Sequence, residues 1–292
     1  MKTKLAGARM AFALSFLALS LQAQPIKVLI VDGQNNHDWK ATTPMLRQIL
    51  EETKLFAVDV ATAPAKGGDM GAFKPEFSKY KVIVSNYNGE RWSKETEAAF
   101  VKFVQAGGGF VPVHAANNSF PDWPEYNRMI GVGGWGGRNE KSGPLLRWRE
   151  GKWVQDTRAG SGGHHGAQHS FLMVTRAADH PVMKGLPEQW MHATDELYDS
   201  LRGPAEGVTV LASAMSSKDK GGTGEDEPLL MALNFGRGRV FHTALGHAAP
   251  AILCQGFTTT LQRGTEWAAT GRVTQKVPAN FPTSDTVSAR AP

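Results

Sequence analysis

Short apolar runs alternate with helical patterns in the first half of the chain. The runs expected to form strands are residues 26–31, 56–62, 81–86 and 110–114. Between them, residues 41–54 and 93–109 carry apolar side chains three and four positions apart, which predicts helices. We expect Thr42 or Thr43 to cap the first helix and Ser93 the second. Continuously apolar strands that alternate with helices predict a doubly wound α/β domain with a mostly parallel sheet.

The second half of the chain has more strand signal. Its expected strands are residues 169–176, 208–215, 229–236 and 239–245. A long helix over 248–269 is predicted to close the domain, despite an internal glycine. Proline and serine then replace large apolar residues, so we expect one folded domain over 24–272 and a flexible tail over 273–292.

The first 23 residues have the pattern of a secretory signal. Lys2, Lys4 and Arg9 precede an apolar run of about eleven residues, and Ala23 is a suitable cleavage position. The run is too short for a membrane span, so we expect a periplasmic or secreted protein without one. Cleavage would lower the formal charge from +5 to +2, because this segment holds three basic residues and no acidic ones. So little excess charge argues against a nucleic-acid partner.

Cys254 is the sole cysteine. An internal disulfide and a cysteine-based zinc site are therefore excluded. The apolar residues around it, 251–257, predict that the thiol is buried inside the closing helix.

Polar segments that contain histidine follow three of the expected strands. They are residues 32–39 with His37, 114–119 with His114, and 246–250 with His247. Ligand crevices in open parallel sheets lie beyond the carboxyl ends of the strands, so these three histidines are expected to line one crevice.

Two further segments carry imidazole and carboxylate groups together. Residues 161–170 include His165, and residues 191–199 include His192, Asp195, Glu196 and Tyr198. A mobile surface loop and a solvated strand are the alternative explanations. We expect Glu196 to reach across the crevice to the three histidines.

Imidazole and carboxylate side chains together can bind a divalent metal or transfer protons near neutral pH. No compact zinc signature occurs, so a metal such as zinc or manganese would take its ligands from separate loops, with His114 and His247 as the candidates. Gly131, Gly133 and Gly134 do not follow a strand and form no dinucleotide fingerprint, so no nucleotide cofactor is expected.

Tryptophans lie in or near the same polar segments. Aromatic faces beside amides and acids are typical of sugar-binding clefts, although each tryptophan could instead belong to the core. We expect a small carbohydrate ligand. The candidate substrate-binding residues are Asn35, His37, Trp39, Asn117, Trp135, His165, His192, Asp195 and Tyr198.

Four ordered segments resemble the ThuA-like family, which is named for trehalose utilisation. They are residues 33–39, 107–120, 191–198 and 238–247, and the resemblance spans roughly residues 25–272. It implies a flavodoxin-like domain related to class I glutamine amidotransferases, whose strand-to-helix turn carries a catalytic cysteine. His114 stands at that position here, so chemistry through a thiolate is not expected. The resemblance also implies a shared polar site of His114, Glu196 and His247.

These observations predict a secreted enzyme of carbohydrate metabolism, a hydrolase or lyase acting on a keto-sugar or disaccharide. His114, Glu196 and His247 are its expected catalytic residues. The alternatives are a non-catalytic carbohydrate-binding module and a metal-dependent hydrolase of a non-sugar substrate. The histidine cluster favours an enzyme, because sugar binding alone does not require imidazoles.

Overall fold

The computed structural model describes residues 24–290. The expected secretory signal, residues 1–23, lies outside this range. Within it, no helix has the length and apolar character needed to cross a membrane.

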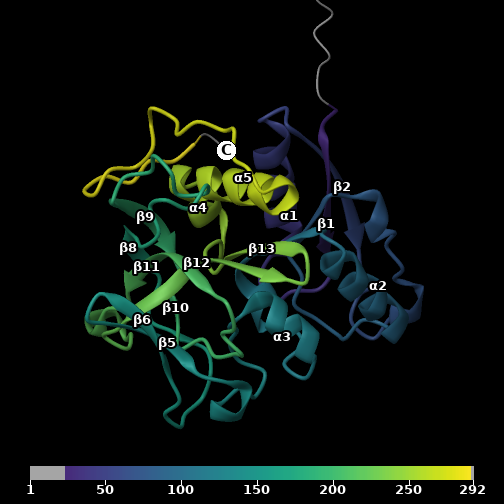
Figure 1. The fold of residues 1–292 in the computed structure, drawn as a ribbon, viewed down its shortest axis with the longest axis horizontal. Coiled ribbons are helices and arrows are strands. Elements are labelled where there is room, and N and C mark those ends of the chain that lie inside the picture. The colour runs from purple at the N-terminus through teal and green to yellow at the C-terminus, as the bar shows by residue number, and fades with distance from the viewer. Residues whose placement is uncertain (1–23, 291–292) are drawn as a thin grey trace, which may run out of the picture.

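A nine-stranded mixed sheet runs through the centre of the molecule (Figure 1), in the order β2-β1-β3-β4-β13-β12-β11-β8-β9. The parallel strands are β1 (Ile26–Asp32), β2 (Phe56–Thr62), β3 (Val82–Ser85), β4 (Gly109–Pro112) and β13 (Gly238–Thr243). The antiparallel strands that continue the sheet are β12 (Asp226–Phe235), β11 (Thr209–Met215), β8 (His169–Thr175) and β9 (Gln189–Asp195). The predicted flavodoxin-like α/β fold is confirmed, and its parallel half carries this antiparallel extension.

Helices cover both faces of the sheet (Figure 1). One face carries α1 (Trp39–Glu51), α4 (Ala249–Ile252) and α5 (Gln255–Thr270), and the other carries α2 (Lys94–Gln105) and α3 (Pro124–Ile130). Alternate residues of β1 enter the two cores: Val28 and Ile30 pack with residues of α1 and α5, whereas Leu29 and Val31 pack with residues of α2 and α3. This two-sided burial explains why the strand is apolar throughout.

Smaller elements lie around the sheet. They are the hairpin β5 (Leu145–Arg149) and β6 (Lys152–Asp156), the pair β7 (His164–His165) and β10 (Tyr198–Asp199), and the 3₁₀ turns Met70–Ala72, Phe77–Lys79, His114–Asn118, Glu140–Ser142 and Lys218–Lys220. The sequence patterns did not predict the hairpin or the short pair.

Of the two predicted helix caps, one is confirmed and the other is wrong. Ser93 caps α2 as predicted and accepts from the Thr96 amide at 3.3 Å. The predicted cap of α1 is wrong, because Asp38 caps this helix and accepts from the Ala41 amide at 3.1 Å. Thr42 and Thr43 are instead buried inside α1, where both hydroxyls accept hydrogen bonds from the side chain of Asn86.

The predicted closing helix is interrupted at Cys254, whose ψ of 127° is not helical and which separates α4 from α5. The backbone on either side of it pairs with the C-terminal segment: the Gln255 amide donates to Ser288 at 2.7 Å and the Arg290 amide donates to Leu253 at 2.9 Å. Cys254 is fully buried, as expected. It lies between the two helices and not inside one.

The C-terminal segment, expected to be flexible, lies against the edge strand β9. The Met191 amide donates to Thr283 at 2.7 Å, and the ring of Phe281 packs against Trp190 at 5.7 Å. These contacts cover backbone groups that an edge strand would otherwise expose.

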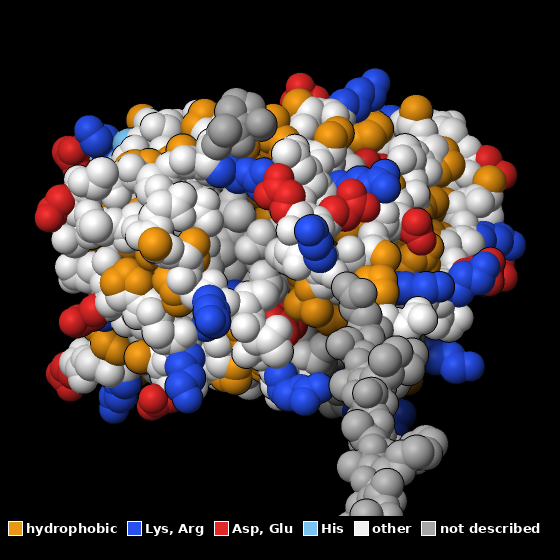
Figure 2. Space-filling model, turned by 90° about the horizontal axis from the view of Figure 1, so that it is seen from above, with side chains coloured by type: hydrophobic (Ala, Val, Ile, Leu, Met, Phe, Trp, Pro, Cys, Tyr) orange, Lys and Arg blue, Asp and Glu red, His pale blue; other side chains and the backbone are white. Residues whose placement is uncertain are grey.

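On the face seen in Figure 2, basic and acidic side chains are interspersed among neutral ones.

One prediction concerns His242 of β13, which is fully buried. Its Nδ1–H donates to the Ile130 carbonyl at 2.8 Å, and its Nε2 accepts from the Asn117 amide at 3.0 Å. Burial lowers the pKa of His242 to about 4, whereas a histidine in an unfolded chain titrates near 6.5. The neutral ring therefore stabilises the fold fully above pH 6.5, and this stability is lost as the pH falls towards 4.

We expect His242 to account for a loss of about 1 kcal/mol in the free energy of unfolding between pH 6.5 and 5.5. Urea denaturation across this range measures the loss. The variant His242→Gln cannot be protonated, so its stability should depend less on pH than that of the wild type, whatever its absolute stability. Equal pH dependence in both proteins would contradict the assignment.

Candidate functional site

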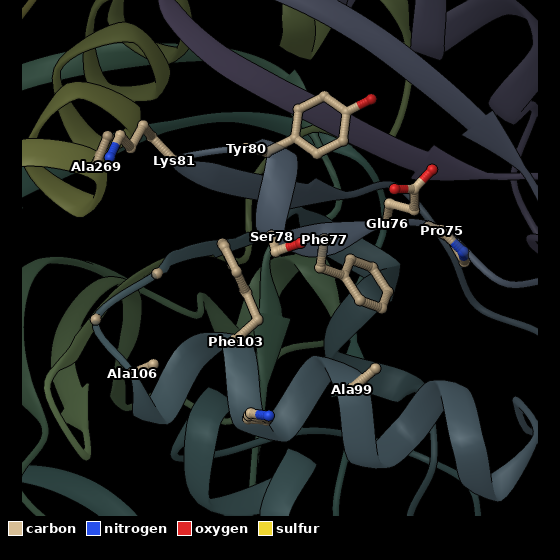
Figure 3. A pocket seen from close by; sticks show the side chains of 13 residues that line it. Pro75, Glu76, Phe77, Ser78, Tyr80, Lys81, Ala99, Phe103, Ala106 and Ala269 are labelled. Carbon is tan, nitrogen blue, oxygen red and sulfur yellow. The ribbon is translucent and has the colours of Figure 1, made fainter.

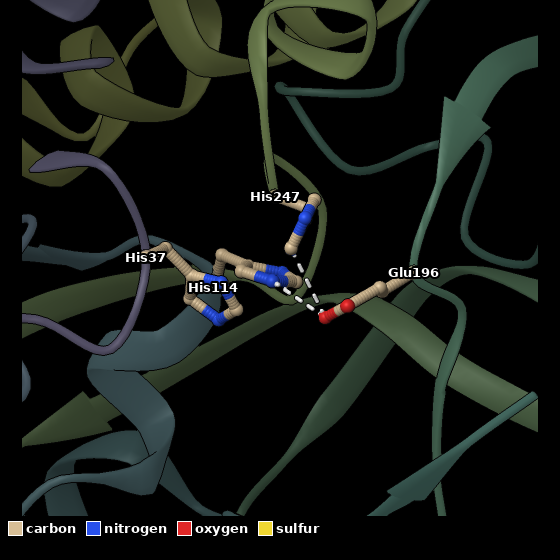
Figure 4. A group of neighbouring side chains, drawn as sticks. All are labelled: His37, His114, Glu196 and His247. Carbon is tan, nitrogen blue, oxygen red and sulfur yellow. Dashed lines mark ion pairs between the residues drawn. The ribbon is translucent and has the colours of Figure 1, made fainter. Parts of the chain in front are cut away.

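Three loops bring histidines to the carboxyl ends of the parallel strands. His37 follows β1, His114 follows β4 and His247 follows β13, while Glu196 follows β9 on the opposite side. The four side chains point toward one another (Figure 4), and one ligand atom from each lies within 4.8 Å of the others. The predicted convergence of these residues is confirmed, and the cluster could hold a metal ion.

His114 sits at a strained turn. Its φ of +48° lies in the left-handed region, which a residue with a side chain adopts at a cost of about 1–3 kcal/mol. Its Nδ1 lies 2.8 Å from the Ala244 carbonyl, which can only accept, so Nδ1 carries the proton of the neutral ring. The lone pair of Nε2 then faces Glu196 Oε2 at 3.5 Å, and this buried nitrogen has no hydrogen-bond partner within residues 24–290.

The carboxylate of Glu196 is the centre of the cluster. His247 Nδ1 lies 3.1 Å from Oε2, and His165 Nε2 lies 3.6 Å from Oε1. Burial raises the pKa of Glu196, but the neighbouring rings of His114 and His247 outweigh this and hold the pKa well below its usual range. The Glu196 carboxylate beside His247 in turn raises the pKa of that ring.

His165 repeats the arrangement seen at His114. Its Nδ1 donates to the Gly166 carbonyl at 2.8 Å, so the Nε2 of the neutral ring presents a lone pair to Glu196. When both rings are neutral, two imidazole lone pairs face one anionic carboxylate. A cation placed among them would turn this repulsion into attraction.

Asp195 lies beneath the cluster and holds the backbone of Glu196 and of His247 in place by hydrogen bonds. Its carboxylate accepts hydrogen bonds from the amides of Glu196 (2.9 Å), Gly246 (2.8 Å) and His247 (3.0 Å) and from His192 Nε2 (2.9 Å). Burial raises the pKa of Asp195, but the hydrogen bond and positive charge of His192 outweigh it and lower the pKa. Burial lowers the pKa of His192, but the bond to Asp195 prevails and raises it to about 9.

Asp195 and His192 were expected to bind substrate, and the structure does not place them at the pocket surface. Both are fully buried. Asp195 ends β9 below the loop that carries His247, and His192 lies beneath Asp195 inside the core. The two residues support the cluster and are shielded from a ligand.

A pocket of about 410 Å³ reaches the cluster at His37 and Glu196, while His247 lines a neighbouring hollow. It is lined by Asn36, His37, Asn88, Asn118, Trp135, Gly136, His165, Glu196 and Tyr198. We call it the Trp135 pocket. The hydroxyl of Tyr198 lies 3.2 Å from His37 Nε2, and its ring stacks on His114 with centroids 4.1 Å apart. Burial is the main cause that lowers the pKa of His37 to about 4.

The other expected substrate-binding residues lie outside this pocket. Asn117 is buried and donates to His242. Asn35 shapes the loop after β1, because its Oδ1 accepts from the His37 amide at 3.0 Å. Trp39 lines a neighbouring groove.

The asparagines 36, 88 and 118 line the pocket and were not predicted. Asn36 and Asn118 stand next to predicted asparagines in the same segments. Asn88 follows β3, a parallel strand that no histidine follows, so the histidine pattern does not point to it. The parallel arrangement of β3 could have pointed to Asn88, because its carboxyl end lies at the same edge of the sheet as those of β1 and β4.

A different hollow, of about 600 Å³, opens at the opposite edge of the sheet (Figure 3). Lys81 and Gly108, which precede β3 and β4, help to line it together with Phe77 and Phe103. Its lining, which falls within the described residues, includes no histidine. The grouping of imidazoles therefore belongs to the carboxyl edge of the sheet.

Two solved structures resemble this fold closely enough to be informative. A protein described as ThuA-like from Parabacteroides merdae is 49% identical, with a TM-score of 0.90, and the match covers 91% of this chain and 98% of that one. Another described as ThuA-like, from Bacteroides uniformis, is 19% identical, with a TM-score of 0.56 and the same coverage, and shares the fold.

No curated protein matches the chain. The family model for ThuA, described as trehalose utilisation, matches residues 27–268. This match spans most of the chain and agrees with the 49% identity to the Parabacteroides protein. The chain therefore belongs to the ThuA family.

Proposed function

We propose that this protein is an enzyme that acts on a small carbohydrate in the Trp135 pocket, with a divalent metal held by His114, Glu196 and His247. The observation that carries the proposal is the buried Nε2 of His114, whose lone pair faces Glu196 Oε2 at 3.5 Å without a partner. Imidazole nitrogens and a carboxylate oxygen are ligands that suit zinc or manganese. The family description supplies the carbohydrate context.

The pocket also holds groups suited to proton transfer. A bound divalent ion would supply polarisation of a substrate carbonyl or hydroxyl oxygen. His37 is neutral near pH 7, because its pKa is about 4, so its ring can accept a proton. Burial raises the pKa of Tyr198, so its hydroxyl stays protonated and can donate to an oxygen of the substrate. A keto-sugar, with an acidic C–H beside a carbonyl, matches this base and donor.

The ring of Trp135 supplies a surface for the sugar. It is half-buried, lines the pocket and meets Tyr198 edge-on with centroids 4.6 Å apart. A sugar ring that stacks there would direct its hydroxyls to the asparagines 36, 88 and 118. Chemistry through a thiolate has no support, because Cys254 is buried away from the pocket lining.

We further propose export from the cytoplasm, on the basic and apolar pattern of residues 1–23. Expression of the full chain in a bacterium with a secretion pathway should yield a mature protein that begins near Gln24. N-terminal sequencing of the protein from the periplasm or medium checks this. Recovery of the protein only from the cytoplasm, with Met1 or Lys2 at its N-terminus, would contradict export.

The metal proposal predicts about one divalent ion per chain in protein purified without added metal or chelator. His114→Asn and Glu196→Gln should each lose the ion. Asparagine is chosen for position 114 because it tolerates a positive φ. Elemental analysis measures the ion, and circular dichroism confirms the fold. His169→Gln, which removes a histidine outside the cluster, is the matched control and should retain the ion.

The same preparations test catalysis with a panel of keto-sugars and disaccharides. Turnover should disappear with the ion and return when zinc or manganese is restored. A wild-type enzyme that turns over sugars without any ion would overturn the metal assignment. Binding of sugars without turnover under all metal conditions would favour a carbohydrate-binding module.

Asp195→Asn tests the support behind the cluster. The variant keeps the shape of the side chain, but its Nδ2 cannot accept, so at least one of the amide hydrogen bonds is lost. Loss of such a supporting group typically lowers metal affinity about 10–100-fold. Competition with a chromophoric chelator measures the affinity. Asp226→Asn, an acid paired with Arg176 away from the site, should leave it unchanged. Unchanged affinity in Asp195→Asn would show that Asp195 does not position the ligands.

A further inference from the structure

A groove of about 630 Å³ runs beside the Trp135 pocket. Its lining includes Gln34, Trp39, Ala65 and Glu90, and we call it the Trp39 groove. Asn36 and Asn88 line both the pocket and the groove. The Asn88 side chain donates to Asn36 Oδ1 at 2.7 Å, so a hydrogen-bonded amide pair forms the boundary between the two spaces.

Trp39 does not belong to the core of the protein. It is the first residue of α1 and is half-buried, but it packs with neither of the two hydrophobic clusters formed by residues 24–290. Its ring carries the Lys40 ammonium 5.6 Å from the centroid. A large aromatic ring outside both cores, on the wall of a groove, leaves a flat apolar surface available for stacking.

The floor of the groove is a fixed structure. Gln34 is only 8% exposed, and its side chain donates to the Pro64 carbonyl at 2.7 Å and accepts from the Glu90 amide at 2.9 Å. Gly89 lies against it so closely that a Cβ there would approach Gln34 to 2.4 Å. Such packing leaves little freedom for rearrangement, so the groove is present before a ligand binds.

Glu90 completes the polar side of the groove. Its Oε2 accepts from the Gly67 amide at 2.8 Å and from Gln34 at 3.2 Å. Its Oε1 has no hydrogen-bond partner among the described residues and can accept from a ligand hydroxyl. The groove therefore presents an aromatic face, an amide pair and a carboxylate, which together suit a polyhydroxylated ring.

We propose that the Trp39 groove binds a second sugar ring of the substrate, linked to the ring that occupies the Trp135 pocket. This inference rests on the proposed function, because it assumes that the Trp135 pocket takes a sugar. The shared Asn36–Asn88 pair would lie under the bond between the two rings. The substrate class is then a disaccharide or the end of a longer glycan, with Trp39 as a specificity residue that is not a member of the histidine cluster.

Calorimetric titration of the metal-loaded full protein tests this subsite, with glucose as the one-ring probe and trehalose, maltose and cellobiose as two-ring probes. We expect at least one disaccharide to bind about tenfold more tightly than glucose. Trp39→Ala should remove this difference and leave glucose affinity unchanged. Trp39→Phe should restore part of it. Trp148→Ala, which removes a half-buried tryptophan of β5, is the matched control and should bind as the wild type does.

Ala65→Trp provides a second test that does not depend on removing a side chain. Ala65 is exposed, so the bulky ring would fill the groove without disturbing the core. It should also abolish the advantage of the disaccharide. If glucose binds but no disaccharide binds more tightly, or if Trp39→Ala weakens both probes equally, the subsite is wrong and the proposed function stands. If no sugar binds, the carbohydrate proposal fails together with the subsite.

Discussion

The site depends on the hydrogen bonds that one buried carboxylate makes to three backbone amides. Asp195 ends a strand in the antiparallel half of the sheet, and two of its donors, Gly246 and His247, belong to the loop after the last parallel strand. The two halves of the sheet are thereby joined at the point where Glu196 and His247 must meet. The Gln168 side chain adds a second link, because its Nε2 lies 3.4 Å from Glu196 Oε1 and 3.1 Å from His247 Nε2.

The neighbouring acids Asp195 and Glu196 differ in burial and therefore in what their carboxylates can contact. Asp195 is enclosed and paired with His192, so its charge is neutralised inside the protein. Glu196 sits at the pocket wall, where it faces ring nitrogens that cannot all donate to it. A charged pair in the interior thus leaves the adjacent carboxylate free to meet a cation from the pocket.

The sequence predicted the parallel strands because their apolar runs are local patterns. It predicted that His37, His114 and His247 meet because the carboxyl ends of parallel strands lie at one edge of a sheet. It could not assign Asp195 and Glu196 to different sides of the pocket wall, since the two acids are adjacent in one polar segment. Tertiary contacts also decided the cap of α1 and the break at Cys254. Asn86 donates hydrogen bonds to Thr42 and Thr43 in the interior. The segment around Ser288 forms backbone hydrogen bonds with Leu253 and Gln255, on either side of the break.

The C-terminal segment has a consequence for how the domain should be delimited in the laboratory. The family match ends at residue 268, yet Phe281 and Thr283 continue to cover β9, the strand that leads to Asp195 and Glu196. A recombinant chain trimmed to the matched region would expose both an unpaired strand edge and the Trp190 ring, a combination that promotes self-association. The unit suited to expression and crystallisation therefore extends through Arg290.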